Sequence, residues 1–428
     1  MTIQPYTDPD VGKTPEQLFA ERSKRVQDAM QLKRPDRIPV ILDASYMPAE
    51  MYGVTRQEQH ENEEKELEML EKAALYFQPD SILGIFPFTN WEANAAVGDR
   101  MTKFPGHGFG PDGSYQFQEG EYMKGEDYDA FIEDPADWSI RKYWPRVFTE
   151  LEGLAHLPPL GNAAFGCYSL LYLGGFTAPP IAKAFHALAR AIEARAAADG
   201  RMIRTMQRLG ALGFVPHPIA VAVIEAPFDL MSDTLRGMRG IMTDLYRRPE
   251  KLLAAQEKVL RFELEGAIDW SRATGINFSF IPLHRGSDGF MSLPQFEKFY
   301  WSQLKTLMLG LVDAGIMPVV FYEGTWNERL KYLAELPKGK TVGWFQSSDI
   351  FKVKEIVGDT MCIMGGMPNS ILQAGTPEKV REFTIELCKK VGKGGGFIMT
   401  TGVGEMEGCK PELVKVWVDT TKEYGVYR

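Results

Sequence analysis

The segment from Ile316 to Gly324 constrains the fold of this chain more than any other stretch. It reads Ile-Met-Pro-Val-Val-Phe-Tyr-Glu-Gly, an apolar run that ends in a tyrosine and a carboxylate. Because the run lies between two helix-like segments, it predicts a buried parallel strand. In barrels of parallel strands the functional side chains gather at the carboxyl ends of the strands. Glu323 is therefore expected at the mouth of a barrel.

Seven other apolar runs read as further strands, and helix-like segments alternate with the later ones. This alternation predicts βαβ units with a parallel sheet, and eight strands are the number that closes a barrel. No Gly-x-Gly-x-x-Gly turn follows the first run, which argues against a dinucleotide-binding open sheet. We therefore predict an α/β fold, a (β/α)8 TIM barrel. Its strands are expected at 38–42, 81–86, 219–224, 276–281, 317–321, 341–345, 360–364 and 396–400.

The long interval between the second and third predicted strands, residues 87–218, is interpreted as an insertion over the barrel mouth. It contains a glycine- and aromatic-rich part, an aspartate- and tryptophan-rich part, and an alanine- and arginine-rich helix. We expect residues 1–428 to form one barrel domain with this insertion after strand two. Residues 1–15, which are polar and contain proline, are expected to form an N-terminal arm.

Composition narrows the class of protein. The 428-residue chain has a net charge of −9 with acidic and basic residues interspersed, which argues against a nucleic-acid-binding surface. No apolar run approaches the roughly 18 residues of a membrane helix, so we expect no membrane partner. The four cysteines are scattered without a Cys-x-x-Cys pair, and we expect no signal peptide and a cytoplasmic location. The sequence leaves a homodimer open.

Several short motifs follow one another along the chain: Arg34–Val40, Glu225–Asp229, Gly289–Phe299, Gly365–Leu372 and Thr401–Gly404. In this order they resemble the uroporphyrinogen decarboxylase superfamily. The resemblance covers most of the chain and implies a barrel with one of two activities. One is decarboxylation of a porphyrinogen, and the other is methyl transfer with a corrinoid protein.

The residues at the predicted strand ends distinguish the branches of this family. Its decarboxylases use an arginine pair after the first strand, where this chain reads Asp43-Ala-Ser-Tyr-Met. Its zinc-dependent thiol methyltransferases use His-x-Cys after strand five, where this chain reads Phe321-Tyr-Glu. The resemblance therefore implies an O-demethylase component. Such an enzyme moves a methyl group from a small molecule, expected here to be a methoxyarene, to cob(I)alamin on a separate corrinoid protein.

Two rival functions stay open at this point. The same mouth could serve a decarboxylase or lyase acting on a non-porphyrin acid, for which Arg285 is the main candidate to grip a carboxylate. Alternatively, a barrel without catalysis could bind a tetrapyrrole or a corrinoid. A lyase needs a cation at the mouth, whereas a carrier needs a broad apolar cavity without an acid.

Three residues at strand ends are the catalytic candidates: Glu323, His284 and Glu225. Cob(I)alamin is already a strong nucleophile, so the enzyme must mainly protonate the leaving oxygen and hold the C–O bond in line. Glu323 or His284 could supply the proton, and Glu225 could position the substrate. The three could instead bind Zn²⁺ with one open position. The structural alternatives are a helix cap or ion pair for Glu323 and a buried structural role for His284.

Other polar and aromatic residues at predicted strand ends are candidates for substrate binding. The polar ones could orient a substrate by hydrogen bonds, and the aromatic ones could enclose an arene. For each, the alternative is a satisfied loop group or a core side chain. Residues 87–122 are expected to form a lid or a docking surface for the corrinoid protein. The binding candidates are Asp43, Tyr46, Asn90, Trp91, Phe228, Phe321, Tyr322, Gln346 and Glu405.

Overall fold

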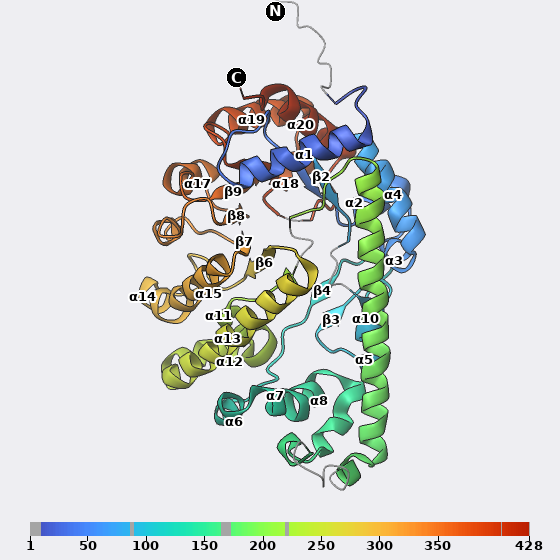
Figure 1. The fold of residues 1–428 in the computed structure, drawn as a ribbon, viewed down its shortest axis with the longest axis vertical. Coiled ribbons are helices and arrows are strands. Elements are labelled where there is room, and N and C mark those ends of the chain that lie inside the picture. The colour runs from blue at the N-terminus through green and yellow to red at the C-terminus, as the bar shows by residue number, and fades with distance from the viewer. Residues whose placement is uncertain (1–9, 86–89, 164–172, 219–221, 404, 428) are drawn as a thin grey trace, which may run out of the picture. The chain divides into compact units, whose positions relative to one another are not determined.

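The computed structural model describes residues 10–85, 90–163, 173–218, 222–403 and 405–427 (Figure 1). The chain divides into two compact units. The barrel unit consists of Met1–Phe86, Ile203–Ala226 and Glu263–Arg428. The inserted unit consists of Pro87–Met202 and Pro227–Phe262.

The barrel unit contains all eight predicted strands, and the predicted (β/α)8 fold is confirmed. Six strands form one parallel sheet in the order β10-β9-β8-β7-β6-β5, and β1 pairs in parallel with β2. A parallel bridge from Val40 to Met399 connects the residue before β1 with β10, and one from Ser81 to Val215 connects β2 with the segment that precedes β5. The strands are β1 (Ile41–Asp43), β2 (Ser81–Leu83), β5 (Ala222–Val223), β6 (Phe278–Leu283), β7 (Met317–Tyr322), β8 (Val342–Phe345), β9 (Cys362–Met367) and β10 (Phe397–Thr401).

Helices connect successive strands of the barrel. Two long helices, α10 (Pro179–Ala211) and α13 (Pro249–Thr274), contribute residues to both units. None of the helices in the described residues combines the length and apolarity that a membrane crossing requires. The other helices of the barrel unit are α1 (Pro15–Met30), α2 (Met47–Tyr52), α3 (Arg56–Glu61), α4 (Glu63–Phe77), α14 (Leu293–Gln295), η6 (Phe296–Trp301), α15 (Ser302–Asp313), α16 (Leu330–Leu333), α17 (Ile350–Val357), α18 (Asn369–Ala374), α19 (Pro377–Lys390) and α20 (Pro411–Tyr424).

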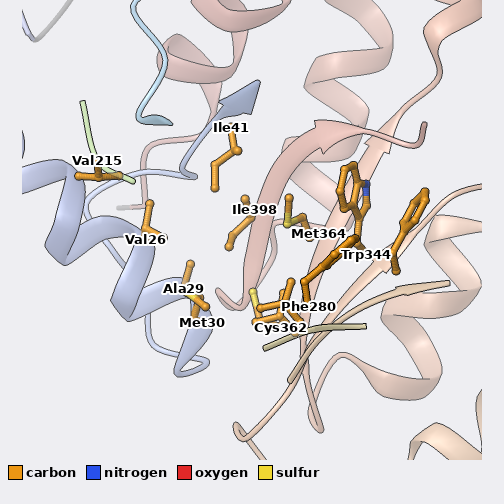
Figure 2. Close-up of a cluster of buried hydrophobic side chains, with 13 residues drawn as sticks. Val26, Ala29, Met30, Ile41, Val215, Phe280, Trp344, Cys362, Met364 and Ile398 are labelled. Atoms are coloured by element: carbon orange, nitrogen blue, oxygen red, sulfur yellow. The ribbon is translucent and has the colours of Figure 1, made fainter. Parts of the chain in front are cut away.

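The barrel interior is filled by apolar side chains from alternate strand positions, as Figure 2 shows. Side chains of α1 belong to the same cluster as the residues at the starts of β8 and β9. This packing occupies the amino-terminal end of the barrel. The carboxyl ends of the strands are therefore available for polar groups. The cluster comprises Val26, Ala29, Met30, Ile41, Val215, Phe280, Val319, Phe321, Val342, Trp344, Cys362, Met364 and Ile398.

A buried ion-pair network lies where β1 and β2 begin. Asp80 is fully buried and accepts hydrogen bonds from both guanidinium nitrogens of Arg37 at 2.8 and 3.0 Å and from Arg25 at 2.5 Å. It also accepts the Val40 N–H at 2.7 Å. Burial by itself would raise the pKa of Asp80, yet the two guanidinium groups hold that pKa well below its usual range. The segment Arg34–Val40 therefore has a structural role here.

The inserted unit has its own core. The inner face of α10 packs there against apolar residues of α5 and η2. The predicted insertion 87–218 thus supplies most of a unit that also includes residues 227–262, and its placement over the mouth stays a prediction. Its elements are α5 (Trp91–Val97), β3 (Thr102–Lys103), β4 (Gln116–Phe117), α6 (Tyr128–Glu133), α7 (Pro135–Trp138), η1 (Ser139–Tyr143), α8 (Trp144–Val147), η2 (Thr149–His156), η3 (Leu160–Ala163), η4 (Leu173–Phe176), α11 (Pro227–Asp229), η5 (Leu230–Arg236) and α12 (Gly237–Arg247).

Candidate active site

The structure brings His284 and Glu323 together at the carboxyl ends of two neighbouring strands. Leu283 of β6 pairs in register with Tyr322 of β7, and the two candidates are the next residues along each strand. His284 Nε2 lies 3.5 Å from Glu323 Oε1, and the side chains are 33% and 35% exposed. A ligand and solvent can therefore reach the pair. When the imidazole is protonated, the pair consists of an imidazolium and a carboxylate.

Strand alternation turns both side chains toward the barrel interior. Phe280 of β6 and Phe321 of β7 belong to the interior cluster. Because successive side chains in a strand point to opposite faces, residues two and four positions further on share the interior face. His284 and Glu323 lie at such positions, directly above the apolar core.

The turn that carries Glu323 is held by two hydrogen bonds and requires a glycine at Gly324. The Gly324 N–H donates to Gln346 Oε1 at 2.6 Å, and the Trp326 indole N–H donates to the Glu323 carbonyl oxygen at 2.8 Å. Gly324 has a φ of +71°, and a Cβ there would lie 2.9 Å from the Ser287 side chain. Only glycine suits this position. Gln346, predicted to bind substrate, therefore positions the turn through its side-chain oxygen.

The loop that follows His284 is clamped by a buried arginine. Arg329 is 1% exposed and donates from one guanidinium nitrogen to the carbonyl oxygens of Ser287 at 2.8 Å and Met291 at 2.9 Å. Its guanidinium carbon lies 4.1 Å from the centre of the Phe296 ring. This clamp ties the loop after β6 to the segment that follows β7, and so stabilises the relative position of the two catalytic candidates.

Glu225, the third catalytic candidate, lies two residues beyond β5 and contacts a carboxylate that the sequence did not suggest. Its backbone N–H donates to Glu263 Oε2 at 3.0 Å. Burial raises the pKa of Glu263 to about 7, against the smaller opposing effect of that hydrogen bond. Glu263 therefore changes charge near neutral pH.

Replacing Glu263 by glutamine should stabilise the protein at pH 8 more than at pH 5. A carboxyl whose folded pKa is raised favours the folded state while neutral, so stability is lost as pH rises from about 4.5 to about 7. Glutamine keeps an acceptor for the Glu225 N–H and carries no charge. We expect a gain on the order of 1–3 kcal/mol at pH 8, measured by urea unfolding. Glu265→Gln, at an exposed position of the same helix, is the control, and an equal gain at both pH values would contradict this expectation.

The proposed zinc ligands do not fit a metal site. Across the part of the chain that the structure describes, no group of three or more His, Cys, Asp or Glu is placed to hold a metal ion. Glu225 therefore does not complete a ligand set with His284 and Glu323. A tetrahedral site with one open position needs three such ligands, so we derive no step through zinc.

A second polar group lies at the end of β1. Asp43 and Tyr46 are both buried, and Tyr46 Oη lies 3.5 Å from His60 Nδ1. Burial, with a smaller contribution from the negative charge of Glu405, raises the pKa of Asp43 well above its usual range. Burial therefore favours the protonated form of Asp43, which could donate a hydrogen bond to an oxygen-bearing ligand. Glu405 itself is exposed.

Two predicted aromatic binders are core residues. Phe321 is 9% exposed and packs on Trp344 with ring centres 4.5 Å apart. Tyr322 is fully buried and stacks on Phe345 at 4.7 Å. Alternation turns Tyr322 to the face opposite Phe321, and its contact with a substrate stays a prediction.

Three other predicted binders lie in the inserted unit. Asn90 is 3% exposed, caps α5 by accepting the Ala93 N–H at 2.9 Å, and donates to the Ala194 carbonyl at 3.0 Å. Its side chain is thus used for structure. Trp91 stacks on His107 at 4.1 Å, and Phe228 is buried.

Three further residues were not predicted: Glu263 and Arg329, described above, and His217. His217 is 3% exposed, and burial lowers its pKa to about 3, so its ring is neutral. Glu263 and Arg329 form hydrogen bonds with segments distant in sequence. No spacing or motif in the chain signals such contacts.

Comparison with protein families gives a match over the second half of the chain. Residues 216–424 match the family described as uroporphyrinogen decarboxylase (URO-D). A uroporphyrinogen decarboxylase of Neisseria meningitidis is 24% identical over 212 residues, covering 46% of this chain and 57% of that protein. One of Psychromonas ingrahamii is 27% identical over 141 residues, covering 32% and 39%. The chain thus spans at most 57% of the length of these two curated relatives.

Comparison with solved structures extends over nearly the whole chain. A methyltransferase from Methanosarcina mazei covers 94% of this chain and 98% of its own length, with a TM-score of 0.59 and 16% sequence identity. At this identity the match shows a shared fold.

Proposed function

We propose that this chain, whose residues 216–424 match the uroporphyrinogen decarboxylase family, is the methyltransferase component of an O-demethylating system. It moves a methyl group from a methylated small molecule, a methoxyarene, to the cob(I)alamin of a separate corrinoid protein. The structural likeness to a methyltransferase supports this assignment.

The observation that carries the proposal is the His284–Glu323 pair at the ends of β6 and β7. A carboxylate beside an imidazole stabilises the imidazolium, and the pair can then give up one proton to an oxygen placed beside it. The pair is partly exposed, so it can be reprotonated from solvent after each turnover. One such general acid is typically worth a factor of about 10²–10⁴ in rate.

The proposed reaction balances without a further reactant. Cobalt(I) attacks the methyl carbon with its own electron pair, so that a Co–C bond forms. The C–O bond breaks, and its electron pair stays on the leaving oxygen. The His284–Glu323 pair protonates that oxygen, and the products are a phenol and the methylated corrinoid. Asp43, whose pKa is raised by burial, lies at another strand end, where its protonated form can donate a hydrogen bond to an oxygen of the substrate.

The residues at the strand ends also distinguish methyl transfer from the rival activities. The stretch after β1, Asp43-Ala-Ser-Tyr46, lacks the arginine pair of the family's decarboxylases. Arg285, the cation considered for a lyase, lies 5.6 Å over the Phe290 ring. A half-exposed acid pair argues against a barrel that only carries a corrinoid. These features favour methyl transfer over both rivals.

The test combines two assays on the purified protein. Free cob(I)alamin serves as the methyl acceptor, and a panel of methoxyarenes and methoxybenzoic acids serves as substrate. Absorbance follows methylcobalamin, and chromatography follows the phenol. Equal amounts of methylcobalamin and phenol are expected. Release of CO2 from the acids without methyl transfer would identify a lyase, and corrinoid binding without either product would identify a carrier.

A further inference from the structure

Asp43 is a buried carboxyl at the end of β1 that faces the barrel interior. Ile41, two residues earlier on the same strand, belongs to the interior cluster, so strand alternation turns Asp43 to the same side. Asp43 is 5% exposed, and its carboxyl receives no hydrogen bond and no cation from any residue in the described ranges. Buried carboxyls are rarely found without a paired cation or hydrogen-bond donors. The position therefore suits a partner that a ligand supplies.

A second buried polar group of this kind lies on the neighbouring strand, β10. Thr400 is fully buried, and its hydroxyl forms no hydrogen bond with the part of the chain that the structure describes. Because Ile398 belongs to the interior cluster, Thr400 also faces the interior. The bridge from Val40 to β10 sets the register and places Thr400 one layer below Asp43. The two polar groups therefore border the same part of the interior.

The charges around Asp43 are negative. Burial raises the pKa of Asp43, and the negative charge of Glu405 raises it further. Arg56, the first residue of α3, pairs with Glu50 at 2.8 Å and with Glu407 at 2.9 Å, so its charge is already balanced. A carboxylate brought to Asp43 would therefore be repelled, whereas a cation would be attracted.

We propose that the methyl donor carries an ammonium group, which Asp43 binds with Thr400 as a second acceptor. This inference rests on the proposed function, because it names the class of the methyl donor. The ionised carboxyl accepts one N–H of the ammonium, and the Thr400 hydroxyl accepts another. A neutral oxygen can use the protonated carboxyl, but an ammonium also offsets the repulsion between Asp43 and Glu405. A cation is therefore the stronger ligand for this position.

The place of Asp43 relative to the acid pair determines the shape of such a donor. Along the order β1-β10-β9-β8-β7, β1 lies four strands from β7. In an eight-stranded barrel this separation corresponds to opposite walls. With the methoxy group at the His284–Glu323 pair, the ammonium must lie at the other end of the arene. A methoxyphenylalkylamine such as para-methoxyphenethylamine has this arrangement.

Equilibrium binding to the full chain, measured by calorimetry without corrinoid, tests the proposal. Three ligands share the methoxyphenyl group and differ at the far end of a short chain. They are para-methoxyphenethylamine, para-propylanisole and para-methoxyphenylpropionic acid, which end in an ammonium, a methyl and a carboxylate. The wild type should bind the amine about 10- to 100-fold more tightly than propylanisole, and the acid most weakly. Equal affinities for the amine and propylanisole, or tightest binding of the acid, would overturn the proposal.

Two pairs of variants test which side chains bind the ammonium. Asp43→Asn should remove most of the preference for the amine over propylanisole, whereas Asp359→Asn, in an exposed turn before β9, should keep it. Thr400→Val should reduce the preference by about 3- to 10-fold. Thr401→Val, at the next position and on the opposite face of β10, should keep it. A preference that survives Asp43→Asn, in a variant that still unfolds cooperatively in urea, would overturn the proposal.

The same ligands separate this inference from the proposed methyl transfer, because binding needs no corrinoid. A preference for the amine that depends on Asp43, without formation of methylcobalamin, would support this site and contradict the proposed function. Methylcobalamin formed at equal rates from all three ligands would support the proposed function and contradict this inference.

Discussion

Replacing Glu323 by glutamine should slow single-turnover methyl transfer to reduced corrinoid by about 10²-fold or more, with the fold intact. Glutamine has nearly the same shape but cannot stabilise an imidazolium at His284, whose Nε2 lies 3.5 Å from the carboxylate. The leaving oxygen would then depart without a proton. His284→Ala should show a loss of similar size. The double variant should lose little more than either single one, because the two residues act as a unit.

The matched control for Glu323→Gln is Glu328→Gln. Glu328 is an exposed carboxylate of the same loop, so its removal changes the net charge equally without touching the pair. Its rate should stay within about twofold of the wild type. Arene affinity, measured by calorimetry, should be nearly unchanged in all these variants. Wild-type rates in both Glu323→Gln and His284→Ala would show that the acid lies elsewhere.

Replacing Asp80 by asparagine should lower the free energy of unfolding by about 3–5 kcal/mol. The carboxylate is fully buried between Arg25 and Arg37, and removing it leaves two buried guanidinium groups without their shared partner. This loss is a large part of the roughly 5–15 kcal/mol that holds a domain folded. Urea unfolding of the variant and the wild type measures the difference.

Asp36→Asn is the control for this prediction. Asp36 pairs with the same Arg25 at 2.6 Å, but its side chain is 59% exposed, so its loss should cost less than about 1 kcal/mol. The stabilisation of the folded state by Asp80 also depends on pH. Because its folded pKa lies below the unfolded value, its stabilisation is present above about pH 4 and is lost as pH falls. Equal effects of the two substitutions would contradict a buried network.

The barrel could be predicted because buried parallel strands appear in sequence as short apolar runs. The run ending in Tyr322-Glu323 and the run ending before His284 became neighbouring strands, β7 and β6. Since parallel strands end at the same side of a barrel, a histidine and a carboxylate at two such ends were expected close together. The order of the two strands along the chain was sufficient to predict that these two side chains lie close together.

Other side-chain environments could not be predicted, for physical reasons. Tyr322 was grouped with Phe321, but neighbouring strand residues face opposite sides, and Tyr322 lies buried against Phe345. Asn90 precedes a helix and caps it, a local role that outweighs its place after a strand. Glu263 and Arg329 act through hydrogen bonds across about 38 to 42 residues of sequence, which no local pattern encodes.

The most direct measurement of the central claim is the dependence of the methyl-transfer rate on the leaving group. Single-turnover rates of the wild type and Glu323→Gln should be compared over methyl ethers whose product alcohols or phenols differ widely in pKa. A poor leaving group needs the proton most, so the ratio of wild-type to variant rate should rise steadily with that pKa. A ratio that stays constant across the series would contradict protonation by the His284–Glu323 pair.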